Sequence, residues 1–386
     1  MRFFRTLSKD TGHFGLLWRR MRVCIAILQL SIVLAVPCSA HGALDQYDVR
    51  VEVGGEYDTN AARVEQVADL PALQPSMLAR LVGLGSYAAR FADRYVLSLS
   101  GGVGGKRYSS SSVAGEDVLV IHTQDMLGVR LDERAFLYLS AGYYDAFQRS
   151  QRESRAFRSI SPMGRWERLV GDSSRLALGV GFRDFVFKSD AAFSFRAPTF
   201  LAQFRQGWPG DVLSGAADWE WSAQGTLELR KFEGPACSVQ ACTGRQADEF
   251  ATGQVEVVRV GRMLLGGGLG MHLNRSNAFG QSLTRGVAHF RAVVPLPLSL
   301  SLSTRLEAVR TQYSEKVTVL VPVSGQASAS IEDESRSSLR FELSRMFGDG
   351  LELGARYAYY TSAATSGGME FHRQTILFYL AAIAEP

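Results

Sequence analysis

The sequence predicts an all-β fold, a transmembrane up-and-down antiparallel β-barrel of about 16 strands, within a range of about 14–18. Three observations predict it. Apolar and polar side chains alternate along most of the chain from Leu44 onward, and a helical period is nearly absent. The alternating segments are about 15 residues long, and the connections between them are in turn short and long.

Residues 1–43 are predicted to be an N-terminal extension and a signal peptide. Arginines precede the apolar stretch 23–36, which is shorter than the roughly 20 residues of a membrane-spanning helix but fits the apolar region of a signal peptide. Small residues up to Ala43 offer cleavage sites. Met21 is a candidate for the true start, because signal peptides rarely carry so long an extension before their positive region. The barrel is then expected to occupy 44–386.

Composition narrows the class of protein further. The 386 residues are 46% hydrophobic and 21% charged, which excludes a disordered chain. The net charge is only +4, and no basic run has interleaved aromatics, so no nucleic-acid partner is predicted. After residue 43 no apolar run is long enough for a membrane-spanning helix, which excludes a helical membrane protein.

The segment 218–232, "DWEWSAQGTLELRKF", has one apolar and one polar face. Trp219 and Leu227 belong to the first, Glu220 and Arg230 to the second. Such a segment extends to roughly 50 Å, whereas strands of globular proteins usually have about five or six residues. Because lipid leaves no backbone group unpaired, the sheet must close on itself. We therefore expect the apolar face to contact lipid and the polar face to line a water-filled or plugged lumen.

The other predicted strands repeat this pattern. Pro162 marks an irregular position, because proline suits an edge or a bulge rather than a regular ladder. The expected spans are 45–57, 77–91, 94–108, 117–131, 134–147, 155–169, 174–188, 195–208, 216–232, 249–260, 262–273, 282–294, 297–312, 335–346, 350–362 and 371–383.

The connections fall into two sets. The short set, such as "FADR", "LDER", "VGR" and "FGDG", consists of tight turns rich in glycine and aspartate. The long set includes "EGPACSVQACTGRQAD" and a loop over 313–334. Short turns on one rim and long loops on the other are typical of outer-membrane barrels. This predicts a bacterial outer-membrane location, contact with outer-membrane lipid and, for an even number of strands, both termini in the periplasm.

The stretch "VEVGGEYDTN" resembles the opening strand of a group of Gram-negative outer-membrane β-barrels. In that group a Gly-aromatic-Asp-polar-Asn sequence stands at the outer end of strand one. Gly55, Tyr57, Asp58 and Asn60 match it, with Glu56 between the first two. Members include barrels associated with exopolysaccharide or capsule export and with surface-secretion machines. The resemblance covers this stretch and the general architecture, and it implies neither catalytic residues nor a cofactor.

The end of the chain departs from that pattern. Barrels of this kind commonly finish their last strand on an aromatic residue, whereas Phe378 and Tyr379 precede Pro386 by several residues. Two alternatives follow: a short tail succeeds the aromatic signal, or the last strand is shifted.

Cys237 and Cys242 lie together in a predicted long loop. In an exported chain this spacing favours a local disulfide, with free thiols as the alternative. No histidine pair or further cysteine lies nearby, so no metal site is predicted.

No motif in the sequence supports catalysis. The glycine-rich "GGVGGKRY" lacks the spacing of a phosphate loop and is expected to reduce bulk in a strand. His122, near Thr123 and Asp125, and His289 are the histidines closest to a catalytic arrangement, but no nucleophile elbow or paired motif accompanies them. We predict no enzymatic activity, no catalytic residues and no cofactor.

The polar strand faces carry both signs of charge, with arginine in excess. Either cross-strand ion pairs fill and stiffen the lumen, or a polar lining lets an anionic or hydroxyl-rich polymer slide. The lumen-lining candidates are Arg175, Arg183, Glu220, Glu228, Arg230, Arg305, Glu307, Arg340, Glu342 and Arg356. The aromatic residues expected at the lipid interface are Trp219, Trp221, Tyr357 and Tyr359.

These features predict a non-catalytic conduit or scaffold in envelope and surface-polysaccharide export, with periplasmic or envelope export-machine proteins as partners. A general diffusion porin is an alternative, for which the 313–334 loop is the candidate constriction, although it is more apolar than is typical. A structural barrel that anchors an adhesion or motility complex is another, and a lumen plugged by side chains would favour it.

Overall fold

The computed structural model describes residues 44–62, 74–92, 94–148, 156–208, 218–237, 241–279, 281–314, 337–363 and 370–385. The predicted signal peptide lies outside these residues, as do most of the 313–334 loop and residues 209–217. Among the residues described, no helix is long and apolar enough to cross a membrane.

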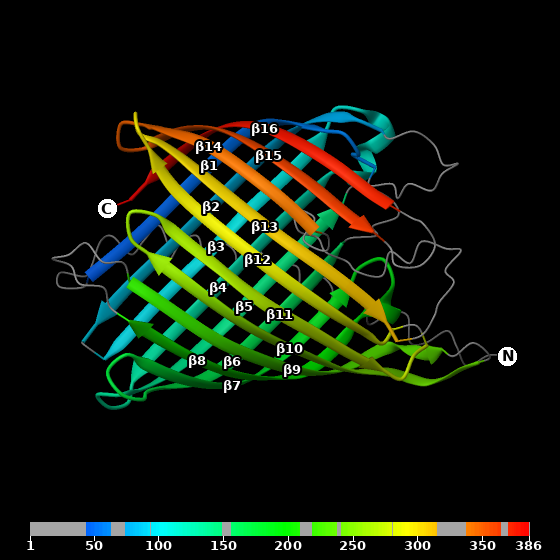
Figure 1. The fold of residues 1–386 in the computed structure, drawn as a ribbon. Coiled ribbons are helices and arrows are strands. Elements are labelled where there is room, and N and C mark those ends of the chain that lie inside the picture. Colours follow the sequence, from blue (N-terminus) through cyan, green and yellow to red (C-terminus); the bar gives the residue numbers. More distant parts are fainter. Residues whose placement is uncertain are drawn as a thin grey trace, which may run out of the picture.

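The chain forms a closed barrel of 16 antiparallel strands in an up-and-down order, as predicted. Each strand pairs with its neighbours in sequence, and β1 closes the barrel against β16 (Figure 1). The strands are β1 (Leu44–Asp58), β2 (Ser76–Phe91), β3 (Tyr95–Tyr108), β4 (Val118–Arg130), β5 (Ala135–Gln148), β6 (Phe157–Leu169), β7 (Ser174–Phe187), β8 (Phe195–Trp208), β9 (Asp218–Cys237), β10 (Cys242–Val260), β11 (Leu264–Ser276), β12 (Leu283–Leu296), β13 (Leu300–Tyr313), β14 (Ser337–Phe347), β15 (Leu351–Ala363) and β16 (Glu370–Ala384).

The connections sort to the two ends of the barrel. Tight turns at 131–134, 170–173 and 348–350 share the end where the chain terminates (Figure 1), which we call the short-turn rim. Gly171 and Gly348 adopt φ of +89° and +62° there, a conformation that glycine tolerates best. The opposite end, the long-loop rim, carries two short 3-10 helices, η2 (Ser111–Glu116) and η3 (Ala191–Phe193).

The hairpin of β9 and β10 differs from the prediction. A long loop was expected over 233–248, but β9 continues to Cys237 and β10 begins at Cys242. That loop prediction was wrong over most of its length. The two strands keep pairing beyond the alternating segment that identified them, through register shifts near Arg245.

Two positions flagged in the sequence fit the barrel without ending a strand. Pro162 lies inside β6, and the pairing with β7 passes from Ile160 directly to Met163, because proline has no N–H to donate. At the end of the chain, β16 continues past Phe378 and Tyr379 to Ala384 and pairs there with β1, so the aromatic pair lies within the strand.

Candidate functional site: the barrel interior

Successive side chains along each strand point in turn to the inner and the outer face of the barrel. Residues that pair directly across two strands point to the same face. In β1, Glu52 and Glu56 are buried, whereas Val51 and Val53, which flank Glu52, are 42% and 56% exposed. The outward set on other strands is also apolar, with Leu139, Val180 and others among the exposed residues. A band of apolar side chains around a closed sheet is the surface that lipid accommodates.

The seam between β1 and β16 is held by a buried ion pair on the inner face. The Arg373 guanidinium donates to both carboxylate oxygens of Asp58, with Nε–Oδ1 at 3.0 Å and Nη2–Oδ2 at 2.7 Å. Tyr108 on β3 donates its hydroxyl to the same carboxylate, and so does the backbone N–H of Asn60. Asn60 also donates its amide to the carbonyl of His372 on β16. Asp58 and Asn60, two residues of the opening-strand motif, therefore join the first strand to the last.

Further ion pairs continue around this side of the lumen. Glu56 accepts from Lys106 at 3.2 Å, and Arg80 lies within 3.8 Å of the same carboxylate. Glu52 is 3.5 Å from Arg80 and 3.7 Å from Arg356. These charges are mostly buried, and each depends on its partners for compensation. We call the inner face of β14–β16 and β1–β3 the charged wall.

Tyr379 is central to the charged wall. Its hydroxyl lies 2.6 Å from Glu342 on β14 and 2.8 Å from Glu352 on β15. Its ring packs over Gly354, where an added Cβ would collide with it. Arg356 donates to Glu342 at 2.6 Å, so the phenol and the guanidinium share one carboxylate.

An arginine row starts at the β14 edge of the charged wall and continues onto β13 and β12. Arg291 on β12, Arg305 on β13 and Arg340 on β14 are directly opposed in register and share the inner face. Arg291 donates to Glu256 at 3.0 Å, and Arg305 donates to Glu307 at 3.3 Å. Like charges directly opposite one another destabilise a sheet, so these carboxylates offset part of the cost.

A second charged group lies on the inner face of β6–β9. Glu228 accepts from Arg183 at 2.9 Å and from Arg230 at 2.8 Å. Arg175 lies 3.4 Å from Glu167, and its side chain is 58% exposed to the interior. Glu220 shares this inner face, since it lies eight residues before Glu228 on β9 and successive side chains of a strand alternate between its faces.

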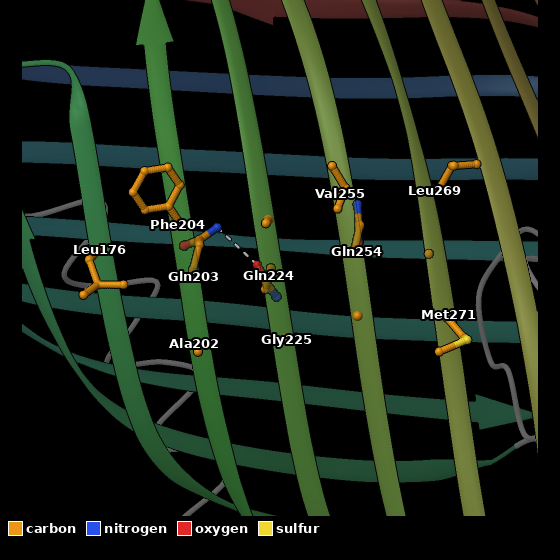
Figure 2. Close-up of a pocket in the computed structure, with 13 residues that line it drawn as sticks. Leu176, Ala202, Gln203, Phe204, Gln224, Gly225, Gln254, Val255, Leu269 and Met271 are labelled. Carbon is orange, nitrogen blue, oxygen red and sulfur yellow. Dashed lines mark hydrogen bonds between the residues drawn. The ribbon is translucent and has the colours of Figure 1, made fainter.

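Three glutamines form an amide row on the same wall. Gln203, Gln224 and Gln254 are directly opposed across β8, β9 and β10, and a 3.2 Å hydrogen bond joins the first two (Figure 2). Thr226 and Thr252 form a hydroxyl pair two residues away on β9 and β10. Small residues such as Gly225 occupy the outer face here and leave a shallow pocket between Phe204, Val255 and Leu269.

An aromatic row crosses the inner face nearer the long-loop rim. Tyr144 stacks on Phe157 at a centroid distance of 5.3 Å, Phe157 contacts Phe185 at 5.1 Å, and Phe185 stacks on Phe195 at 4.9 Å. The row extends at one end to His122 and at the other to Phe232. No local sequence pattern predicts this row, because the rings belong to different strands and meet only through the strand register.

The predicted lipid-interface aromatics all lie on the outer face. Trp219 is 46% exposed, and Trp221 beside it packs against Phe204 of β8. Trp208 pairs with Trp219 across the strands, so both indoles lie close to the short-turn rim. Tyr357 and Tyr359 are outward on β15, and the Tyr359 hydroxyl lies 2.9 Å from His372 Nδ1.

The remaining candidates have these positions. Cys237 and Cys242 are joined by a disulfide at the tip of the β9–β10 hairpin. His122 faces the interior, whereas Thr123 and Asp125 both lie on the outer face, so the three side chains do not converge. Within the described part of the chain, no group of histidine, cysteine and acidic side chains could hold a metal ion.

Comparison with known proteins finds similarity to solved structures alone. No family model and no curated protein sequence matches the chain. Its fold is similar to OccK11 (OpdR) of Pseudomonas aeruginosa, at 11% identity and a TM-score of 0.44 over 89% of this chain and 96% of that one. OccAB1 of Acinetobacter baumannii gives 9% identity and a TM-score of 0.48 over 88% and 96%, and a bacterial polysaccharide outer membrane secretin gives 9% and 0.41 over 86% and 97%.

The closed sheet and its apolar outer band decide the setting of the molecule. The protein is a bacterial outer-membrane β-barrel. All ten lumen-lining candidates named from the sequence lie on the inner face of this barrel, and they divide between the charged wall, the arginine row and the β6–β9 group.

Proposed function

We propose that this outer-membrane barrel is a non-catalytic conduit for export of a surface polysaccharide that carries anionic groups. The arginine row carries the proposal. Three directly opposed guanidinium groups are costly in a sheet, and an anionic chain would offset that cost as it passes.

The carboxylates beside the row give the site a way to release its cargo. Glu256 and Glu307 already pair with Arg291 and Arg305, so an incoming anion exchanges with a partner instead of occupying an empty cationic site. Exchange of this kind keeps binding weak at each step, which conduction requires. The exposed side chains of Arg291 and Arg305, each 48% accessible, provide room for that exchange.

The test uses the refolded barrel in a planar bilayer with polygalacturonate oligosaccharides of uniform length. We expect transient current blockades that lengthen with the oligosaccharide and shorten in Arg305→Gln and Arg340→Gln. Arg345→Gln is the matched control, because Arg345 is on the outer face of β14. Blockades that are absent, or equal in all variants, would contradict the proposal.

A general diffusion porin is the second candidate. The observation in its favour is that the inner side chains of Arg175, Arg291 and Arg305 are 58%, 48% and 48% accessible, so neighbouring side chains do not close the lumen around them. A porin would show steady conductance to small ions and no blockade that depends on polymer length.

An export conduit also needs proteins that deliver the polymer. We place such partners, from the periplasm or the envelope, at the short-turn rim, where the chain terminates. Co-purification of envelope proteins with the barrel after crosslinking at the turns 131–134 and 348–350 tests this placement. Equal capture from crosslinkers at η2 and η3 would contradict it.

A further inference from the structure

We propose that the aromatic row is a stacking site for pyranose rings, so that the barrel recognises the sugar backbone of its cargo separately from any charge. This deepens the proposed function and rests on it. The row runs from His122 on β4 through Tyr144, Phe157, Phe185 and Phe195 to Phe232 on β9.

Ring geometry leaves part of most aromatic faces in the row uncovered, although Phe195 itself is buried. Tyr144 and Phe157 are nearly parallel, at an interplanar angle of 6°, with centroids 5.3 Å apart. Parallel rings in contact are separated by about 3.5–4 Å, so a centroid distance of this size requires a lateral slip. Offset stacking exposes face and edge to the lumen, and Tyr144, Phe157, Phe185 and Phe232 are only half-buried.

Arg230 extends the row onto the next strands. Its guanidinium lies 5.0 Å from the ring centroid of Phe195 and 3.7 Å from that of Phe250 on β10. Phe250 in turn contacts His272 on β11 at a centroid distance of 6.0 Å. Planar groups thus continue from β4 to β11, along the side of the lumen that faces the charged wall.

A row of hydrogen-bonding groups lies directly beside the rings. Two residues nearer the short-turn rim on the same inner face, Phe157 is followed by Ser159, Phe185 by Arg183 and Phe232 by Arg230. Arg183 bonds both Ser159 and Glu228, which fixes the row in place. Two residues along a strand correspond to roughly 7 Å, so aromatic faces and polar groups are within reach of one bound ring.

This pairing of surfaces matches the chemistry of a sugar. The C–H groups on one face of a pyranose are slightly positive and pack on the negative face of an aromatic ring. Its hydroxyl groups point sideways and require donors and acceptors. Ligand sites commonly combine aromatic walls with a few such polar groups. Cross-strand aromatic pairs also stabilise a sheet, so the test separates binding from stability.

Equilibrium dialysis of the full barrel in detergent measures binding without requiring an open pore. The probes are cellohexaose and maltohexaose, which are neutral, and a poly(vinyl alcohol) oligomer of similar mass, which carries hydroxyls but no rings. We expect at least one hexaose to bind at low and high salt alike, and the ring-free oligomer not to bind. Phe185→Leu and Phe157→Leu should weaken binding about two- to tenfold.

Phe182→Leu is the matched control, since Phe182 lies on the same strand as Phe185 but on the outer face and is 43% exposed. Phe185→Tyr keeps the ring and should retain binding, and it reports on the site if the leucine variants do not fold. Absence of hexaose binding, equal loss in Phe182→Leu, or equal binding of the ring-free oligomer would each overturn the proposal. Loss of the polygalacturonate blockades with hexaose binding intact would instead count against the anionic conduit alone.

Discussion

Asp58 and Arg373 are 315 residues apart in sequence and form a two-point ion pair across the seam of the barrel. Their side chains are 0% and 1% exposed. A buried pair contributes little beyond what packed apolar residues would, but removing one partner strands the other charge. The pair therefore contributes more to the choice of β16 as the partner of β1 than to the free energy of unfolding.

Arg373→Ala should lower the free energy of unfolding by about 3–5 kcal/mol, because it leaves the Asp58 carboxylate buried without its partner. Urea unfolding in lipid vesicles, followed by tryptophan fluorescence, measures the change. Arg196→Ala is the control: Arg196 pairs with Asp184, but its side chain is 70% exposed, so a loss of at most about 1 kcal/mol is expected. Similar losses in both variants would contradict the role of burial.

Gly354→Ala should destabilise the barrel by about 1–3 kcal/mol, as overpacking does. The new methyl group collides with Tyr379 and moves its hydroxyl away from Glu342 and Glu352. Gly55→Ala serves for comparison, since nothing lies within 4 Å of a Cβ there. If thermal unfolding of the two variants coincides, the ring does not depend on that glycine.

The tryptophans should report on one membrane interface. Trp166, Trp208, Trp219 and Trp221 all point outward in the half of the barrel next to the short-turn rim. We expect lipids brominated near the headgroup to quench their fluorescence more than lipids brominated at the chain end. Strong quenching by aqueous iodide would show that these indoles face water instead.

Loss of the disulfide should leave the barrel folded. Cys237 and Cys242 close only a small loop, so the chain-entropy estimate is about 2 kcal/mol. In Cys237→Ser/Cys242→Ser we expect heat-modifiable gel mobility to persist while trypsin cleaves faster after Arg245 in the hairpin. Wild-type protein under reducing agent should behave alike. Failure of the double variant to insert into vesicles would mean that the disulfide acts during assembly.

Much of the fold could be predicted because period-two alternation is a local property. The alternation that begins with Trp219 and Glu220 identifies two faces without information from any other strand. Most predicted strand bounds agree with those of the structure within a few residues. The extension of β9 to Cys237 could not be read in this way, because beyond the membrane the alternation ends while the pairing with β10 persists.

The site was less accessible to prediction for a related reason. Arg305 and Arg340 could each be assigned to the lumen from their own strands, but their direct opposition depends on register. The aromatic row depends on it even more, since Phe157, Phe185 and Phe195 lie in three strands whose relative heights no single segment encodes. The contact of His122 with Tyr144 also depends on register, because the two rings lie on β4 and β5. The residues next to His122 in sequence do not indicate this contact.

The Asp58 contact also has a consequence for biosynthesis. The strand that carries this aspartate is synthesised early and the arginine that pairs with it almost last, so the seam can form only after nearly the whole barrel sequence has been made. Contacts between such distant positions form slowly. A chain that lacks β16 would therefore leave Asp58 without its guanidinium partner at an open sheet edge, so a truncated product should fail to close into a barrel.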